Sequence, residues 1–297
     1  MAAEDKPLAV LVNPSAGGGR ARELLPRVEA ELDKRRITFR VERTKGPAHA
    51  VAEAENAVDA GEIPVVMSGD GLLGMIGGAI AGTGIPMGIL PAGRGNDLAR
   101  VLGIPTDPEG AVSVLAERET RTIDVGEANG QRFLGIASVG FDSDANRIAN
   151  ETRVVRGSLV YAYAALRALA AWKPARFTVS AGDEHLRFTG YTVAAANSKA
   201  YGGGMFVAPD ADLADGELDV VMVGEVGKLR FLGNLPKVFK GTHVEQDEVK
   251  VFRARSIDLS ASRPFAVYAD GEHITDLPAK IRILPGALDV IAPSQTA

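Results

Sequence analysis

The sequence of 297 residues predicts an α/β fold in two parts, a layered α/β domain followed by an antiparallel β-sandwich. Three observations carry this prediction. Apolar runs alternate with amphipathic segments as far as about residue 125, and strands that alternate with helices form a parallel sheet covered on both faces. Short alternating runs separated by turn residues follow, as in an antiparallel sandwich. Hydrophobic residues make up 46% of the chain, enough for two cores.

The elements of the first part are expected in a regular order. Its strands are short apolar or alternating runs, and its helices carry apolar residues at a spacing of three to four. The expected strands are Leu8–Val12, Thr38–Glu42, Pro64–Met67 and Met87–Leu90, and the expected helices are Arg20–Lys34, Ala48–Ala60, Leu72–Ala81 and Asp97–Leu102. Gly61 directly follows the second helix and is typical of a helix C-terminus.

The pattern changes near Asp124, where short strands separated by turn pairs such as Asp215-Gly216 begin. The expected strands are Arg132–Ala137, Arg176–Ser180, His185–Ala196, Leu218–Val223, Glu248–Phe252, Ser256–Ser260 and Phe265–Ala269. Helical segments at Ser158–Trp172 and Lys228–Phe239 interrupt them. We therefore place a domain boundary between residues 124 and 125.

Charge and cysteine content exclude several classes of protein. Lys plus Arg is 33 and Asp plus Glu is 38, and the net charge of −5 argues against a nucleic-acid partner. The chain has no cysteine, which excludes disulfides, thiolate zinc sites and a cysteine nucleophile. Its four histidines are not at metal-ligand spacing. No uncharged apolar stretch reaches about 18 residues, so we expect no membrane-spanning helix.

Glycine-rich loops follow three of the expected strands, at Asn13–Arg20, Ser68–Gly71 and Pro91–Asp97. Glycine lets a backbone approach a bulky anion, and a helix N-terminus offers free N–H groups at the positive end of its dipole. The first of these loops, Asn13–Arg20, matches neither GxGxxG nor GxxxxGK[ST]. Since the carboxyl ends of parallel strands share one crevice, three such loops favour a common nucleotide site over three unrelated turns.

Several polar residues in these loops have two interpretations. Asp70, between two glycines, either binds Mg²⁺ or orients a hydroxyl, or it caps the following helix. Arg94 either neutralises a phosphate or is a solvated loop charge. Asn96 and Asp97 are able to cap the next helix while facing the same crevice.

Carboxylates gather in two later segments. Asp270-Gly271-Glu272 follows a strand and could meet Asp70 across a cleft, where a carboxylate would accept the proton of a substrate hydroxyl. The alternative is a hairpin turn, which Asp-Gly often forms. The second segment is an oxygen-rich run that suits a hard cation such as Mg²⁺, although spacing alone favours a solvated acidic loop. That run consists of Asp210, Asp212, Asp215, Glu217 and Asp219.

Taken in order, these motifs resemble the bacterial diacylglycerol kinase family, which shares its catalytic domain with sphingosine kinases. The resemblance runs from Val10 to about Ile283. It implies an ATP-dependent lipid kinase with a Rossmann-like α/β nucleotide-binding domain at 1–124, completed by 279–297, and a β-sandwich lipid domain at 125–278. The implied acceptor is diacylglycerol. The alternative acceptor is a sphingosine-like long-chain base or another lipid. The alternative functions are an NAD kinase-like activity and a catalytically weak nucleotide-binding protein.

The resemblance also assigns roles to individual residues. Glu272 is implied as the proton acceptor with help from Asp270, and Asp70 places the catalytic Mg²⁺ or is the rival base. The implied ATP contacts are Asn13, Pro14, Ser15, Gly17, Thr44, Ser68, Gly69, Asp70, Gly71, Leu72, Gly93, Arg94, Asn96 and Asp97. A structural Mg²⁺ site maps to Asp212, Asp215 and the backbone carbonyl of Glu217. Ser68, Leu72 and Arg94 stand where diacylglycerol kinases usually have glycine, threonine and threonine, which leaves the lipid acceptor open.

A bilayer substrate requires a docking surface, and Arg147–Arg176 carries six basic residues against one acid together with Trp172. Such a segment suits a peripheral helix on anionic lipid. The alternative, which we weight more heavily, is a helix that buries Leu159, Tyr163, Leu166 and Leu169 in the core. We expect a cytoplasmic protein that is peripheral at the inner face of the membrane, is able to form a homodimer and has no nucleic-acid partner.

Overall fold

The computed structural model describes residues 6–141, 143–144, 148, 167 and 169–294. Its N-terminal part is a four-stranded parallel sheet of order β2-β1-β3-β4. The strands are Leu8–Val12 (β1), Phe39–Arg43 (β2), Ile63–Ser68 (β3) and Gly88–Pro91 (β4), and the helices are Arg20–Lys34 (α1), Pro47–Asp59 (α2), Asp70–Ile80 (α3), Asp97–Val101 (α4) and Pro108–Glu117 (α5). The expected parallel sheet is confirmed.

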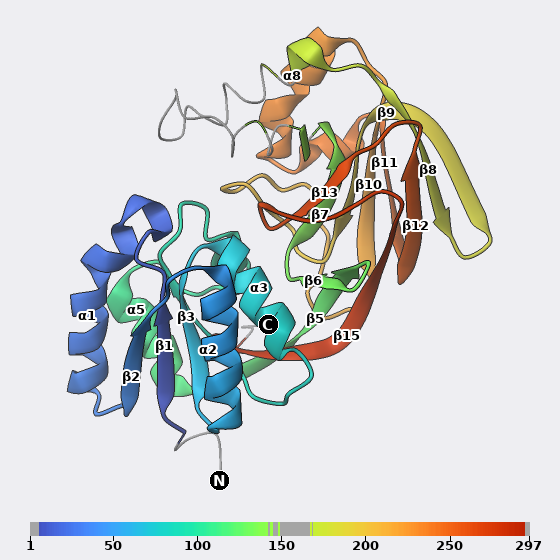
Figure 1. The fold of residues 1–297 in the computed structure, drawn as a ribbon. Helices are drawn as coiled ribbons and strands as arrows, with labels where there is room; N and C mark the ends of the chain where they lie inside the picture. Colours follow the sequence, from blue (N-terminus) through green and yellow to red (C-terminus); the bar gives the residue numbers. More distant parts are fainter. Residues whose placement is uncertain (1–5, 142, 145–147, 149–166, 168, 295–297) are drawn as a thin grey trace.

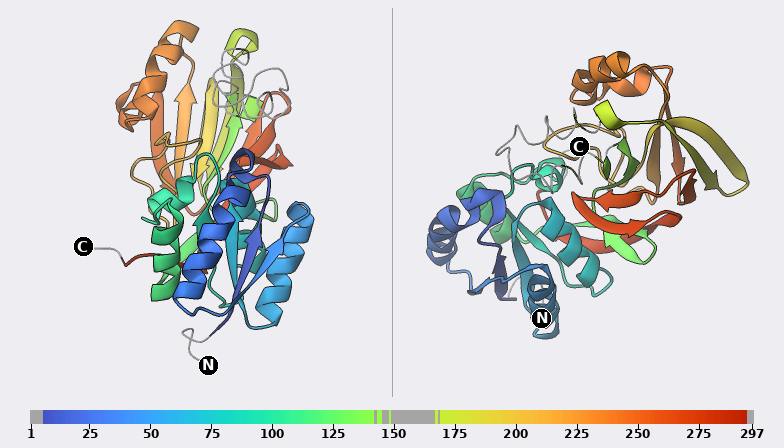
Figure 2. Two further views of the ribbon diagram at one scale, coloured as in Figure 1. Left: turned by 90° about the vertical axis from the view of Figure 1, so that its left-hand side faces the viewer. Right: turned by 45° about the horizontal axis from the view of Figure 1, so that its top comes forward.

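Two pairs of helices cover this sheet. α1 packs beside α5 on one face, and α2 packs beside α3 on the other (Figures 1 and 2). β1 and β3 are buried along their whole lengths, as expected for parallel strands between two helical layers. α1 buries one face through Ala21, Leu25, Val28 and Leu32, which follow the helical repeat.

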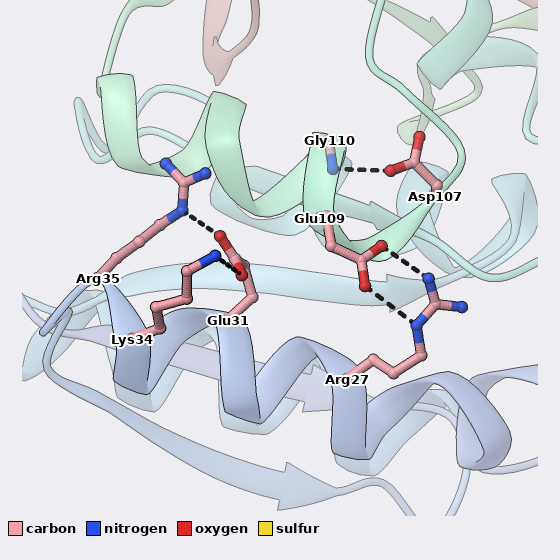
Figure 3. A network of polar contacts seen from close by, with 7 residues as sticks. All are labelled: Arg27, Glu31, Lys34, Arg35, Asp107, Glu109 and Gly110. Atoms are coloured by element: carbon pink, nitrogen blue, oxygen red, sulfur yellow. Dashed lines mark hydrogen bonds and ion pairs between the residues drawn. The ribbon is translucent and has the colours of Figure 1, made fainter.

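Polar contacts fasten the outer helices to each other. Arg27 of α1 binds Glu109 of α5 through two hydrogen bonds of 3.1 and 2.7 Å, and Asp107 caps α5 by accepting the N–H of Gly110 (Figure 3). The sequence prediction missed α5, although an Asp followed directly by a Pro is a typical helix start.

The C-terminal part is a large antiparallel sheet, which confirms the expected α/β fold class with an antiparallel second half. Its strands are Thr120–Ala128 (β5), Gln131–Phe133 (β6), Ile136–Gly140 (β7), Ala175–Ala181 (β8), Glu184–Ala196 (β9), Leu218–Gly224 (β10), Val249–Ala254 (β11), Ser256–Ala261 (β12), Ala266–Ala269 (β13), Glu272–Asp276 (β14) and Ala279–Ile291 (β15). Their order is β14-β13-β7-β9-β8-β12-β15-β5-β6, with β10 joined to β9 and β11 to β10. The helix Lys228–Val238 (α8) lies at the end of this sheet farthest from β1–β4 (Figure 1).

One expected strand was wrong. Arg132–Ala137 divides into β6 and β7, because the backbone N–H groups of Leu134 and Gly135 donate to a carboxylate instead of to a neighbouring strand. That carboxylate belongs to Asp270, and the break is therefore part of the candidate site described below.

The expected helix Ser158–Trp172 lies largely outside the described residues, as do Arg147, Arg153 and Arg156. Trp172 itself is described and is 3% exposed, stacked on Tyr191 in the second core. An interfacial role for this tryptophan is therefore wrong, and its core packing follows the alternative interpretation. No described helix combines the length and the apolar character needed to cross a bilayer.

The paired strands β5 and β15 connect the two parts of the molecule. Ile123 and Val290 belong to the first hydrophobic core, whereas Ala128 and Ile281, farther along the same two strands, belong to the second. Val290 also forms a bridge to Met87 beside β4. β5 thus crosses the boundary that the sequence places between residues 124 and 125.

Asp124 lies where the two cores meet and is 2% exposed. One carboxylate oxygen accepts the N–H of Gly216 and the other that of Gly286, both at 2.7 Å. Its backbone carbonyl accepts from Asn197, and its N–H donates to Leu213. Asp124 therefore joins β5 to the acidic loop and to the irregular region of β15.

Replacing Asp124 by Ala should lower the free energy of unfolding by about 3 kcal/mol, because two backbone N–H groups would lose the charged acceptor that Asp124 supplies from a buried position. Asp124→Asn keeps one acceptor oxygen and should lower the free energy of unfolding by a smaller amount. Urea unfolding measures the value for both variants. Asp258→Ala, which removes an exposed carboxylate on β12, should change the value by no more than ~0.5 kcal/mol. Equal stability of Asp124→Ala and the wild type would refute this role.

Candidate active site

The three glycine-rich loops meet at the carboxyl ends of the parallel strands, with glycine packed on backbone. A Cβ atom on Gly17 would lie 2.4 Å from the carbonyl oxygen of Ala92, and one on Gly93 would lie 2.5 Å from the Cα of Gly69. No side chain fits at these contacts. The absence of Cβ atoms therefore brings the loops expected from the sequence into one site.

Hydrogen bonds fix the first two loops to each other. Asn13 donates from Nδ2 to the Oγ of Ser68 at 3.3 Å and accepts the N–H of Ser15 at 3.1 Å. Thr44 is 8% exposed, and its hydroxyl donates to the carbonyl of Val12. Ser15 and Arg94 are exposed at the rim, whereas Pro14, Gly17 and Leu72 are half-buried.

Asn96 closes the third loop on itself. Its Oδ1 accepts the N–H of Gly93 at 2.7 Å, its Nδ2 donates to the carbonyl of the same residue, and its backbone has φ of 52°. Asn96 is only 2% exposed. In this structure its side chain shapes the loop.

Asp70 is the first residue of α3, yet it caps a different helix. Its Oδ1 accepts the N–H of Leu98 at 3.1 Å, which is the second residue of α4. Asp97 in turn accepts the N–H of Gly203, from a loop of the C-terminal part, at 2.7 Å. Burial raises the pKa of Asp97, and the charge of Asp70 adds to this effect. Asp97 therefore links the two parts at the site.

Asp270 and Gly271 form a tight turn between β13 and β14, with φ of 53° and 89°. The hairpin interpretation of this motif is thus correct, and the hairpin also reaches the site. A Cβ on Gly71 would lie 3.0 Å from the Cγ and Oε1 atoms of Glu272, and one on Gly74 would lie 2.6 Å from an oxygen of Asp270. Both carboxylates therefore lie against the N-terminal end of α3.

The two hairpin carboxylates have different environments. Asp270 accepts the N–H groups of Leu134, Gly135 and Ile136 at 2.9, 3.0 and 3.2 Å. Burial raises its pKa to about 6, with a further rise from the charge of Asp70, while the three hydrogen bonds act in the opposite direction. Glu272 is exposed, and partial burial of its carboxyl raises its pKa. Glu272 is therefore the hairpin carboxylate open to a ligand.

The acidic loop does not gather its side chains. Asp212 accepts the N–H of Ala214, and Asp215 accepts that of Glu217 while its other oxygen faces Arg253 at 3.5 Å. Within the described part of the chain, no group of three His, Cys, Asp or Glu residues is arranged to hold a metal ion. A structural Mg²⁺ site at Asp212, Asp215 and Glu217 stays a prediction.

An apolar cavity of about 80 Å³ lies in the C-terminal part, between α8 and the sheet. Val221, Val223, Leu235 and Val238 are among its lining residues, and Tyr201 and Met205 line it beside the loop that carries Gly203. Because Gly203 binds Asp97, the cavity wall is connected to the candidate site by a short segment of chain.

Sequence reasoning missed several backbone N–H groups that contribute to the site. Gly203 lies in a run of three glycines, Gly202–Gly204, all with positive φ, and that run was a signal in the sequence. Leu134 and Gly135 gave no signal, because an unpaired backbone N–H group leaves no trace in residue type.

Comparison with known proteins covers nearly the whole chain. Residues 7–128 match the diacylglycerol kinase catalytic domain, and residues 135–292 match the YegS C-terminal NAD kinase beta sandwich-like domain. A diacylglycerol kinase from Mycobacterium tuberculosis is 36% identical over 96% of this chain and 95% of that protein. One from Staphylococcus aureus is 27% identical over 96% and 92%. The crystal structure of a diacylglycerol kinase from Bacillus anthracis shares the fold, with a TM-score of 0.75, 21% identity and coverage of 99% and 98%.

The raised pKa of Asp270 predicts a pH-dependent stability. An unfolded Asp ionises near pH 3.8, but the folded protein holds this proton until about pH 6. Asp270 therefore favours the folded state below its unfolded pKa, and this contribution is lost as the pH rises through about 6. Relative to Asp270→Asn, which cannot ionise, the wild type should lose stability between those two values. Urea unfolding of both proteins across this pH range tests the prediction. A difference in free energy of unfolding that stays constant with pH would contradict it.

Proposed function

Since this chain belongs to the bacterial diacylglycerol kinase family and is a lipid kinase, which implies the use of ATP, we propose that it converts diacylglycerol to phosphatidic acid. The observation that carries the mechanism is the position of Glu272. Its exposed carboxylate lies against Gly71, in the first turn of α3 and beside the meeting point of the three glycine-rich loops. A proton acceptor is thus adjacent to a phosphate-binding arrangement.

The glycine loops suit the phosphates of ATP. The first N–H groups of a helix have no partner within that helix, so the N-terminal end of α3 presents donors and the positive end of a dipole. Arg94 at the rim supplies a positive charge. Contacts from Asn13, Pro14, Ser15, Gly17, Thr44, Ser68, Gly69, Gly71, Leu72, Gly93, Asn96 and Asp97 belong to this proposal.

Asp70 would hold the Mg²⁺ that accompanies the nucleotide. Mg²⁺ is commonly bound by one or two carboxylates together with substrate phosphates. Asp70 fits this requirement, because one of its oxygens caps α4 while the other lies near the Asp97 carboxylate, where two acids repel each other. A bound cation there would neutralise charge on the phosphates.

In the proposed reaction, the hydroxyl oxygen of the lipid attacks the γ-phosphorus of ATP while Glu272 accepts the hydroxyl proton. The bond from that phosphorus to the bridging oxygen breaks, and ADP leaves with the electron pair. The raised pKa of Glu272 makes it a better acceptor than an ordinary carboxylate. Asp270 is a positioning residue, since its hydrogen bonds to Leu134, Gly135 and Ile136 hold the hairpin that carries Glu272.

The apolar cavity supports a lipid acceptor, because its lining residues Tyr201 and Met205 flank the loop that binds Asp97. A long-chain base is the alternative acceptor. We place the enzyme at the cytoplasmic face of the membrane as a peripheral protein.

The acceptor is tested by incubating the enzyme with radiolabelled ATP and a total lipid extract, then separating the products by head group. Labelled phosphatidic acid would support diacylglycerol as the substrate. A labelled long-chain base phosphate would replace it with the alternative, and the absence of any labelled lipid would refute lipid phosphorylation under this proposal.

Glu272→Gln should lower kcat about 10³-fold, because an amide cannot accept the hydroxyl proton, while the Kd for ATP stays unchanged. Turnover and nucleotide binding are measured separately. Asp276→Asn is the matched control: it removes an exposed carboxylate from the same strand, where Asp276 contacts only His273 among the contacts described, and should leave kcat unaltered. Near-normal turnover of Glu272→Gln would remove Glu272 from the mechanism.

Gly93→Ala should weaken ATP binding by about tenfold or more, since its Cβ would force the backbones of Gly69 and Gly93 apart and misplace the N–H donors. Isothermal titration gives the Kd. Gly227→Ala is the control, because a Cβ there meets no atom within 4 Å and its φ of −59° suits alanine. Identical affinity of the Gly93 and Gly227 variants would show that the close loop contact does not matter for the nucleotide.

A further inference from the structure

We infer that α8 and its C-terminal flank form the surface through which this enzyme docks on an anionic lipid bilayer. The inference rests on the proposed lipid kinase function, since a water-soluble acceptor would need no such surface. It assigns to α8 the docking role that the sequence suggested for Arg147–Arg176.

Three of the four exposed large hydrophobic side chains lie at this helix. Among the described residues, four large hydrophobic side chains stand out as exposed: Leu229 at 86%, Phe239 at 53%, Val251 at 42% and Phe206 at 39%. Leu229 lies in α8 and Phe239 follows its last residue, while the N–H of Phe206 donates to the carbonyl of Val238. Large exposed apolar groups that cluster on a soluble protein mark an interaction surface.

α8 has two apolar faces, and among the described residues only one of them lines the protein interior. Its inner face lines the cavity through Phe231, Asn234, Leu235 and Val238. Its outer stripe follows the helical repeat and consists of Leu229, Gly233, Pro236 and, one residue past the C-cap, Lys240, all of them exposed. No charge lies on this stripe before its last residue, and no residue of the helix is buried. Within the described part of the chain the outer face is therefore exposed, as entry into a bilayer interface requires.

The charge of this segment complements an anionic membrane. Residues 226–244 contain four basic residues and no acidic one, in a chain whose net charge is −5. Arg230 is paired with Glu248, whereas Lys228 donates to the carbonyl of Ala170 and Lys237 to the neutral side chain of Gln246. Among the described residues, Lys228, Lys237 and Lys240 therefore have no acidic partner. Exposed apolar groups flanked by lysines are the composition of an interfacial helix, and each base adds attraction to anionic lipid.

The place of α8 in the molecule fits this role. The helix lies at the end of the antiparallel sheet, away from the parallel sheet of the N-terminal part (Figures 1 and 2). Tyr201 and Met205 line the cavity beside it and flank the loop that binds Asp97. A bilayer on α8 therefore lies on the side of the cavity opposite to the nucleotide loops, leaving those loops accessible to ATP.

The test is co-sedimentation of the full chain with vesicles of phosphatidylcholine and phosphatidylglycerol in equal parts, and with vesicles of phosphatidylcholine alone. The double variant Leu229→Ser/Phe239→Ser should lower the partition coefficient on the anionic vesicles by about tenfold or more, because two apolar side chains no longer enter the interface. Lys240→Glu should weaken binding to the anionic vesicles alone. The controls are Val251→Ser, an exposed apolar residue on β11, and Lys280→Glu, an exposed lysine on β15. The inference would be overturned if the double variant and Val251→Ser had equal partition coefficients on the anionic vesicles. It would also be overturned if the wild type did not bind anionic vesicles.

A second measurement separates docking from catalysis. With a short-chain diacylglycerol that is soluble as a monomer, the double variant should turn over at the wild-type rate, although it fails on the same vesicles loaded with long-chain diacylglycerol. If the double variant loses vesicle binding and the wild type phosphorylates neither diacylglycerol, the proposed acceptor is refuted and the docking surface stays supported. Equal vesicle turnover by variant and wild type would refute the docking surface and leave the acceptor intact.

Discussion

The carboxylate of Asp270, held by three consecutive backbone N–H groups, is the interaction on which the geometry of the site depends. It occupies the break between β6 and β7, supplies the acceptors that this break requires, and fixes the end of the β13–β14 hairpin against α3. A buried acid with a pKa near 6 is a costly anchor in a neutral solution. Its effect is to present Glu272, two residues later, at a defined place beside the glycine loops.

The second constraint is the absence of side chains at the glycines of the N-terminal loops and of α3. Gly69 and Gly93 approach so closely that only hydrogen atoms fit between them, and Gly71 and Gly74 leave room for the hairpin acids. The site is therefore built by acids from the C-terminal part that enter space left open by glycines of the N-terminal part. Asp97 acts in the reverse direction, because an acid of the N-terminal part binds Gly203 of the C-terminal part. Carboxylates of each half thus contact the other half at the site.

The local sequence pattern predicted most of the helices and strands but few of the hydrogen bonds between distant residues. Strands such as β1 and helices such as α1 follow from apolar spacing, and the glycine loops follow from residue type alone. The partner of Asp70 is Leu98, in another helix, and no spacing rule links an acid to a backbone N–H 28 residues away. The division of Arg132–Ala137 had the same cause, since its residues alternate like a single strand and the acid that interrupts them lies 134–136 positions later. Trp172 shows the limit of composition, because an aromatic among bases suits a membrane interface and a packed core equally well.

The strands β5 and β15 have a consequence for biosynthesis. Leu288, Val290 and Ile291 complete the hydrophobic core around the parallel sheet, although they come from β15, which follows the whole antiparallel part in the sequence. While the protein is being made, β1 to β4 emerge first, but one edge of their core stays open until β15 has been translated. The first half therefore cannot mature as an independent unit during synthesis, and a ribosome that stalls before residue 288 releases a chain whose oldest part is still incomplete.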